Sequence, residues 1–278
     1  MTTTSLTAGP TTASSRRAAW RAFCALTARD LYVLRHNVPA IVIQISLQPL
    51  LFIFAFAYVM PSIGQGVGGP VSFSTILLPG MIATTLTVQS IMSVTQPLSA
   101  ELGPGREITD RALAPLPIWA VGLQKITSSA VFGLFGALTV APIVWLVHAP
   151  GQAPQADIRN WPLLTVTLVL CALLSSVLGL LLGTLVDASS FGTLFGLLLA
   201  AATVLGCAYY PWAALDDIRW VQILVLVNPL VYMSEGLRAA LTPDVEHMPA
   251  WAYLTALTTT TTVLGHAALR RFTRRVRT

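Results

Sequence analysis

Long apolar stretches separated by short polar segments make up most of this sequence. More than half of the 278 residues are hydrophobic and only 10% are charged, whereas a soluble globular domain carries about 25% charged residues. A helix needs roughly 20 apolar residues to cross a bilayer. The sequence therefore predicts one all-α membrane domain, residues 38–269, with six transmembrane helices. The six predicted spans are Ile41–Met60, Phe73–Leu98, Ile118–Val147, Trp161–Val186, Phe191–Tyr210 and Trp251–Leu269.

Almost no charge lies within these predicted spans, where only Lys125 falls, near the start of the third. A pathway for an ion or a sugar usually needs polar groups that converge at the bilayer midplane. The spans offer aromatic and sulfur-containing side chains instead, which suit an amphipathic or apolar solute. Packing against lipid or other helices remains the alternative for most of them. These side chains are Phe52, Phe54, Phe56, Tyr58, Met81, Met92, Phe191 and Phe195.

The region before the first span divides into two parts. Residues 1–15 are mostly Thr, Ser and Ala without an apolar period, which predicts a disordered tail. Residues 16–37 form a basic amphipathic pattern typical of an interfacial helix that lies in the headgroup plane. A solvated helix packed on a partner is the alternative. The predicted apolar face consists of Trp20, Phe23, Cys24, Thr27, Leu31 and Leu34.

Two pairs of glycines are spaced four residues apart in the later spans. They are Gly179 with Gly183, and Gly192 with Gly196. This spacing lets helix backbones approach closely. Chance in spans that are rich in Gly and Leu is the other interpretation.

Residues 211–242 do not form a simple span. Trp220–Val227 and Leu230–Leu241 are both too short to cross a bilayer, and Asn228-Pro229 separates them. We expect a re-entrant pair of helices that dips into one leaflet. Within it, Glu235 and Arg238 are spaced to form an ion pair. Charges at membrane depth suggest a function, but a simple anchoring of the turn is an equal alternative.

The basic residues predict the orientation of the chain. Thirteen of the 16 share one side if there are six spans, and this side should be cytoplasmic. Both termini, the basic tail 270–278 and the polar segment 99–117 then lie in the cytoplasm. The thirteen are Arg16, Arg17, Arg21, Arg29, Arg35, Arg106, Arg111, Lys125, Arg270, Arg271, Arg274, Arg275 and Arg277.

No catalytic or metal-binding pattern is visible. The chain lacks G-x-x-x-x-G-K-[ST], so it binds no ATP by that route. Its four histidines lie far apart, and its three cysteines have no metal or disulfide spacing. We therefore expect that the chain is not an enzyme by itself and holds no metal or cofactor.

Several motifs resemble those of ABC-2 type exporter permeases, most closely the daunorubicin-resistance type. They are Leu78-Pro79-Gly80, the stretch Arg111–Pro117 (RALAPLP), and the most specific one, Asn228–Arg238 (NPLVYMSEGLR). The resemblance covers about residues 20–275. It implies a transmembrane subunit in the bacterial cytoplasmic membrane that pairs with a second permease copy, identical or different. Two copies of a separate cytoplasmic ATPase would bind ATP and Mg and contact the N-terminal helix and segment 99–117.

The resemblance also assigns roles to particular residues. The coupling segment 99–117 would act on the ATPase, although a solvated loop is the simpler interpretation of its composition. The substrate would leave past the outer re-entrant helices, residues 211–242. The implied ATPase-coupling residues are Glu101, Arg106, Glu107, Asp110 and Arg111, and the implied outer-gate residues are Asn228, Pro229, Tyr232, Glu235 and Arg238.

The expected function is export of an amphipathic or hydrophobic substrate, such as a drug, lipid or glycolipid. An exporter of a lipid-linked polysaccharide is one alternative. A proton-coupled secondary transporter is another, but it would need a titratable group within a span. A membrane-embedded enzyme would need paired carboxylates or a histidine there. With a net charge of +5, we expect membrane lipids, and not nucleic acid, to be the counter-charge.

Overall fold

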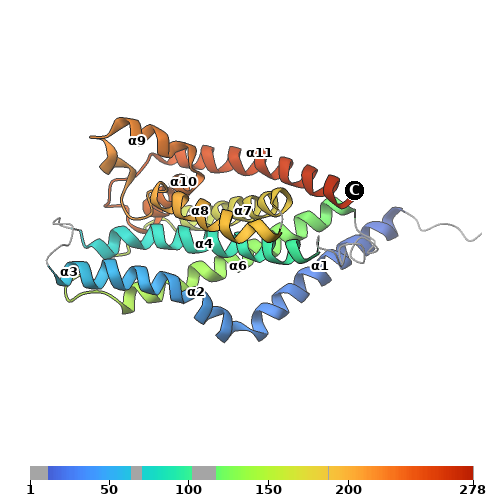
Figure 1. Ribbon diagram of the computed structural model, residues 1–278, viewed down its shortest axis with the longest axis horizontal. Helices are drawn as coiled ribbons and strands as arrows, with labels where there is room; N and C mark the ends of the chain where they lie inside the picture. Colours follow the sequence, from blue (N-terminus) through green and yellow to red (C-terminus); the bar gives the residue numbers. More distant parts are fainter. Residues whose placement is uncertain (1–11, 64–70, 102–116, 187, 278) are drawn as a thin grey trace, which may run out of the picture.

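The computed structural model describes residues 12–63, 71–101, 117–186 and 188–277, and these residues form helices and loops without a strand. The all-α prediction is confirmed for this part of the chain. The helices run mostly along the long axis of the molecule (Figure 1). In chain order they are α1 (Thr12–His36), α2 (Val38–Ile53), the π-helix η1 (Phe54–Val59), α3 (Met60–Ser62), α4 (Phe73–Glu101), α6 (Ile118–Leu146), α7 (Trp161–Leu185), α8 (Ala188–Val204), the 3-10 helix η2 (Trp212–Leu215), α9 (Arg219–Leu224), the 3-10 helix η3 (Val225–Val227), α10 (Pro229–Leu241) and α11 (Ala250–Arg277).

Among the described residues, four helical stretches are long and apolar enough to cross a membrane, not six. They are Val38–Ser62, Phe73–Leu98, Ile118–Leu146 and Trp161–Leu185, and the bent pair formed by residues 219–241 would make a fifth if it were one span. The apolar part of α8, Gly192–Val204, is shorter than a span. α11 is long enough, but its run of five threonines, residues 258–262, lowers its hydropathy. The prediction of six spans is therefore supported only in part.

α4 is the central helix of the bundle. In its most apolar window, 72% of the residues are buried inside the protein, compared with 22% for the α2 stretch. It contacts α2, α6, α7, α8 and α10. Many of its side chains are small hydroxyls that bond to the helix backbone, such as Thr84 to the Gly80 carbonyl oxygen and Thr87 to the Ala83 carbonyl oxygen, both at 2.8 Å. These hydroxyls can be buried because their hydrogen bonds are already satisfied.

The first glycine pair brings α7 against α4. A Cβ atom on Gly179 would lie 2.9 Å from the Cα of Ile91, and one on Gly183 would lie 2.9 Å from a methyl group of Leu98. Close backbone approach is therefore confirmed for this pair. Gly192 and Gly196 on α8 have nothing within 4 Å of the same position. Their predicted helix contact is absent from the described part of this single chain.

α1 is longer than expected and divides its apolar residues between two sides. It begins at Thr12, within the segment that we expected to be a disordered tail, and residues 1–11 lie outside the described residues. Phe23 and Leu34 of the predicted face contact or lie within the protein, whereas Trp20 is 68% exposed and Leu31 is 51% exposed. The inner side packs on the bundle together with Ala19, Ala22 and Leu26. The exposed side remains available to a lipid surface.

The predicted basic tail is helical through Arg277, because α11 continues to that residue. The guanidinium group of Arg275 donates a hydrogen bond to the Thr184 carbonyl oxygen at 2.7 Å. Thr184 lies in the last turn of α7, whose terminal carbonyls have no partner within the helix. This contact fixes the C-terminal end of α11 to the end of α7.

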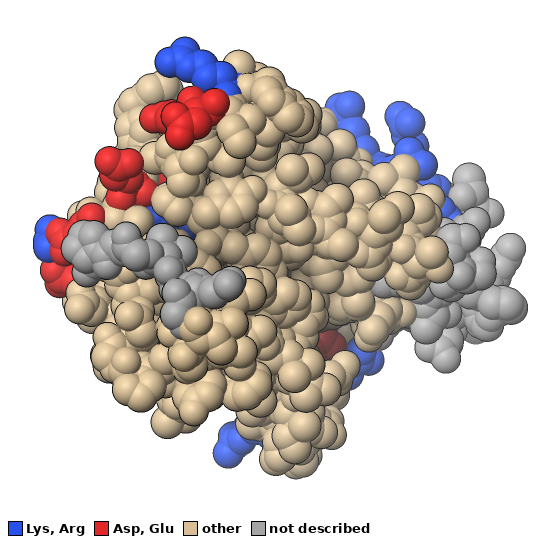
Figure 2. All heavy atoms as spheres, turned by 60° about the vertical axis from the view of Figure 1, so that its left-hand side comes forward, with Lys and Arg blue, Asp and Glu red and all other residues tan. Residues whose placement is uncertain are grey.

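Many of the charged side chains lie at the two ends of the bundle, whereas Arg29, Asp30 and Arg35 lie on α1 close to its turn into α2. An exposed acidic group lies at the end formed by α9 and the loops before α7 and α11, as Figure 2 shows. The basic end of α11 lies at the opposite end, beside the start of α1 (Figure 1). The largely uncharged surface between them matches the hydrocarbon layer of a bilayer. The acidic residues are Asp157, Asp216, Asp217, Asp244 and Glu246.

We predict that Gly179→Val destabilises the fold, because the added side chain would overlap the backbone of α4. Overpacking of this kind costs about 1–3 kcal/mol. Thermal unfolding in detergent, followed by size-exclusion, measures the loss. Gly192→Val is the matched control, since that position is open in the single chain. An equal melting temperature for the two variants would contradict the close α4–α7 contact.

Candidate functional site

The segment after α8, residues 206–248, forms one end of the bundle, and we call it the cap; its helix α10 packs against α4, α7 and α11. It contains η2, α9, η3, α10 and the loop that leads to α11. Residues 219–227 and 229–241 meet at an angle of 100°. The break predicted at Asn228-Pro229 is therefore confirmed.

Asn228 forms the break by capping α10. Its side-chain oxygen accepts a hydrogen bond from the Leu230 amide at 3.0 Å, and Pro229 occupies the first helical position, where its missing N–H is not needed. Its side-chain amide donates to the Ala202 carbonyl oxygen of α8 at 2.7 Å. One asparagine thus ends one helix, begins another and attaches both to α8.

Glu235 connects α10 to two loops of the cap. It is fully buried. One carboxylate oxygen accepts hydrogen bonds from the Trp212 amide at 2.9 Å and from the guanidinium of Arg238, and the other accepts from the Met248 amide at 2.9 Å. Both oxygens are therefore engaged by the protein.

Arg238 completes this buried cluster. Its side chain is fully buried and pairs with Glu235. Its second terminal nitrogen donates to the carbonyl oxygens of Cys207 at 3.1 Å and Tyr210 at 3.4 Å. Because these contacts reach residues 207–212 and 248, the pair fixes the conformation of the cap from within. This geometry favours the anchoring interpretation of the two charges.

The cap rests directly on α4. A Cβ atom on Gly80 would lie 1.8 Å from the Ala208 carbonyl oxygen, so only glycine fits at that position. The preceding residue, Cys207, has a φ of 50°, a left-handed conformation that is uncommon for a residue with a side chain. It turns the carbonyl oxygen of Cys207 toward Arg238. The Gly80 in the Leu-Pro-Gly motif therefore serves this contact.

A second ion-pair cluster joins the cap to the loop before α7. Arg159 donates to both carboxylate oxygens of Asp244, at 2.9 and 3.0 Å, and to Asp157 at 2.7 Å. These hydrogen bonds, first that with Asp157 and then that with Asp244, raise the pKa of Arg159. The cluster is exposed and subject to screening by salt.

The predicted outer-gate residues do not line one surface. Glu235 and Arg238 lie in the interior of the cap, and the Tyr232 hydroxyl donates to the Leu226 carbonyl oxygen at 2.9 Å. Asn228 and Pro229 line an apolar cavity of about 260 Å³ between α4, α7, α8 and α10. The gate assignment stays a prediction.

The ATPase-coupling assignment cannot be compared with the structure for most of its residues. Glu101 is the last residue of α4. Arg106, Glu107, Asp110 and Arg111 lie outside the described residues. Of the coupling segment, the structure describes only residues 99–101 at the end of α4 and Pro117, which precedes α6.

A polar contact that the sequence reasoning missed joins α1 to α6. The Gln124 amide, which is 1% exposed, donates to Asp30 and to Ser128, both at 2.8 Å. Lys125 is only 7% exposed and lines a cavity of about 210 Å³ together with Arg29 and Asp30. The signal in the sequence was a single acid, Asp30, within a basic helix, but its partner on α6 could not be read from spacing.

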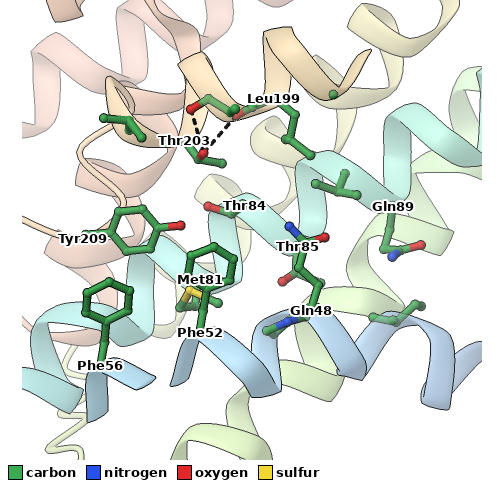
Figure 3. A pocket seen from close by; sticks show the side chains of 16 residues that line it. Gln48, Phe52, Phe56, Met81, Thr84, Thr85, Gln89, Leu199, Thr203 and Tyr209 are labelled. Atoms are coloured by element: carbon green, nitrogen blue, oxygen red, sulfur yellow. Dashed lines mark hydrogen bonds between the residues drawn. The ribbon is translucent and has the colours of Figure 1, made fainter. Parts of the chain in front are cut away.

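A cavity of about 600 Å³, which we call the α2–α4–α8 cavity, lies between these three helices (Figure 3). One end is lined by Phe52, Phe56, Met81 and Tyr209, and the other end by Gln48, Thr85 and Gln89. A volume of this size fits a drug-sized molecule. Phe52, Phe56 and Met81 were among the side chains predicted to face a solute, whereas Thr85, Gln89 and Tyr209 were not singled out.

These features describe a helical membrane protein with a cavity between its helices and a cap at one end. Within the described residues, no group of His, Cys, Asp and Glu could hold a metal ion. The chain belongs to the ABC-2 type transporter family, whose pattern matches residues 21–242.

The chain is similar to proteins that are named as transport permeases. The chain is 28% identical over 228 residues to the inner membrane transport permease YadH of Escherichia coli K12, and equally to the protein of the same name in Shigella flexneri. The match covers 79% of this chain and 82% of each relative. The resemblance is thereby confirmed: the chain is a transmembrane ABC transporter permease that works with an ABC ATPase subunit.

We predict that Glu235→Ala opens the cap. Removing one partner of a buried ion pair costs about 3–5 kcal/mol, and two backbone amides lose their acceptor as well. Cys207 is fully buried beside the pair. In a chain whose other cysteines, Cys24 and Cys171, are replaced, Cys207 should become reactive to a maleimide.

The control is Glu246→Ala, which removes an exposed acid from the same loop. Size-exclusion confirms that each variant remains folded. A Cys207 that stays protected in Glu235→Ala would show that the pair does not hold the cap together.

Proposed function

We propose that this chain is the membrane subunit of an ATP-driven exporter that moves an amphipathic or hydrophobic compound, such as a drug, lipid or glycolipid, out across the bacterial cytoplasmic membrane. The observation that carries this proposal is the course of α4. Its C-terminal end adjoins segment 99–117, its middle lines the α2–α4–α8 cavity, and its Gly80 contacts the cap. One helix thus connects the expected motor contact, the substrate cavity and the exit.

The proposed topology has six crossings and a re-entrant pair, with both termini in the cytoplasm. Figure 1 supports it, because the start of α1 and the end of α11 lie at the same end of the bundle, where α4 ends and α6 begins. The separation of acidic and basic side chains between the two ends agrees with this orientation. The cap would then lie at the outer side.

Coupling to the ATPase would use two contacts. Segment 99–117, with Glu101, Arg106, Glu107, Asp110 and Arg111, would receive the nucleotide-dependent motion directly. α1 would receive it in parallel and pass it to α6 through the Asp30–Gln124 hydrogen bond. Both routes lead to helices that contact α4.

A second permease copy, identical or different, would complete the transport unit, with two ATPase copies below it. Gly192 and Gly196 on α8 face open space in the single chain, and Leu194 and Leu197 on the same helix are exposed. A helix surface with small residues and a spacing of four suits contact with another helix. This surface adjoins the α2–α4–α8 cavity, whose lining includes Gly196.

The cap would act as the outer gate by moving as one body. Glu235 and Arg238 hold its loops to α10, while Asn228 and Tyr232 fix the bend between its helices. A proton-driven exchange gains no support from Glu235, since both of its oxygens are engaged.

The proposal is tested by reconstituting the chain with its ATPase. We predict that the two co-purify, and that inside-out vesicles accumulate an amphiphile only when ATP is present. Glu107→Arg, in the coupling segment, should abolish substrate-stimulated ATP hydrolysis while the permease still inserts. Unchanged stimulation in that variant would remove segment 99–117 from the mechanism, and accumulation without ATP would refute the exporter.

We predict a separate effect for Asp30→Leu, which removes the acceptor for the buried Gln124 amide. Substrate-stimulated ATP hydrolysis should fall about tenfold, because losing a hydrogen bond to a charged group costs about 1.5–3 kcal/mol. Asp30→Asn retains an acceptor oxygen and should keep most of the stimulation. If both variants behave like the unmodified protein, α1 does not transmit motion through α6.

A further inference from the structure

The α2–α4–α8 cavity has two chemically different ends. At one end, the rings of Phe52 and Phe56 each lie 5.8 Å from the ring of Tyr209, centroid to centroid, with interplanar angles of 20° and 27°. These offset rings form a wall against which a flat apolar group can stack. At the other end, Gln48 from α2 and Thr85 and Gln89 from α4 line the cavity (Figure 3).

The polar end carries hydrogen-bonding capacity that the described protein leaves unused. Thr85 is only 5% exposed, and its hydroxyl makes no hydrogen bond with any described residue. Its neighbour Thr84 differs, because the Thr84 hydroxyl donates to the Gly80 carbonyl oxygen at 2.8 Å. The side-chain amides of Gln48 and Gln89 also have no hydrogen-bond partner in the described part of the chain. Thr85 is buried, whereas Gln89 is half-buried and Gln48 is exposed in the single chain. Their unused donors and acceptors face the cavity, where a ligand or solvent can bond to them.

The position of the Gln89 side chain is set by its contact with α6. A Cβ atom on Gly136 of α6 would lie 2.8 Å from the Cγ of Gln89 and 3.6 Å from the Thr85 methyl group. The glycine therefore leaves just enough room for both side chains against α6. The placement of the Gln89 and Thr85 side chains therefore depends on the contact between α4 and α6.

None of the sixteen residues that line the cavity is charged. A charged head group that entered it would lose its hydration without gaining an opposite charge. An amide or a hydroxyl can both donate and accept, and so can the groups at the polar end. The polar end therefore discriminates against carboxylates, phosphates and ammonium groups.

We propose that the cavity binds an amphiphile with an uncharged hydrogen-bonding head and a flat apolar body. The head bonds to Gln48, Thr85 and Gln89, and the body lies against Phe52, Phe56 and Tyr209. This proposal rests on the export function and adds the chemical class of the substrate. Gln48, Thr85 and Gln89 are then the residues that determine specificity.

The test uses three dansyl probes with the same ring and alkyl chain but different ends: a primary amide, a carboxylate and a trimethylammonium group. Their binding to the permease–ATPase complex in nanodiscs is followed by dansyl fluorescence. We predict that the amide binds at least tenfold more tightly than either charged probe. Thr85→Val should reduce amide binding about fivefold, the loss expected for one hydrogen bond, and leave the charged probes unchanged.

Thr84→Val is the matched control, because that hydroxyl is bonded within its own helix. It should leave the binding of all three probes unaltered. Equal binding of charged and uncharged probes would overturn the proposal. Equal effects of the two threonine variants would also overturn it. A third contradicting result is that no probe binding depends on Thr85, as expected if a second copy or bilayer lipid fills the cavity.

The failure of this proposal is distinguishable from failure of the export function. ATP-driven accumulation of an amphiphile that is insensitive to Thr85 and the glutamines would refute the binding site and leave the exporter intact. Amide binding that depends on Thr85, without any ATP-driven accumulation, would refute the exporter and leave the site intact.

Discussion

Close backbone contact between α4 and its neighbours is the constraint on which the rest of this structure depends. In a bilayer, lipid competes as well as an apolar side chain for a helix surface, so helices associate through packing and small residues. Here Gly179 meets Ile91, Gly133 meets Ser90 and Gly80 meets Ala208, each at a distance that excludes a side chain. These three contacts place α7, α6 and the cap around one helix. The positions of the cavities follow from them.

The buried ion pair in the cap has a different function from the small-residue contacts. Glu235 and Arg238 gain little net stability, because both lose their hydration on burial. They bond instead to backbone groups of residues 207, 210, 212 and 248, which have no helix or sheet partner. An apolar pair of the same volume would leave those amides and carbonyls unsatisfied. The charges are therefore required by the irregular backbone around them.

The sequence was informative wherever a local rule decides the outcome. The bend at Asn228-Pro229 follows from helix capping, and the Gly179–Gly183 contact follows from residue size. Pairing across elements was not predictable: nothing in the spacing joins Asp30 to Gln124, or Glu235 to the amide of Met248. The sixth predicted span stays a prediction, because the hydropathy of α11 is lower than that of the four apolar stretches. Its threonines bond to their own helix, as Thr258 does to the Leu254 carbonyl oxygen at 2.7 Å, which lowers the cost of burying them.

The contacts of α4 also limit how the cavity and the cap can move. Thr85 and Gln89 lie on the same helix as Gly80, less than three turns away. A rotation of α4 that carried the polar groups out of the cavity would press the backbone at Gly80 against Ala208, where there is no free space. Ala208 follows Cys207, whose carbonyl is held by Arg238, so the displacement would reach Glu235 and the whole cap. In the proposed mechanism, emptying the cavity and shifting the cap would therefore be parts of one movement.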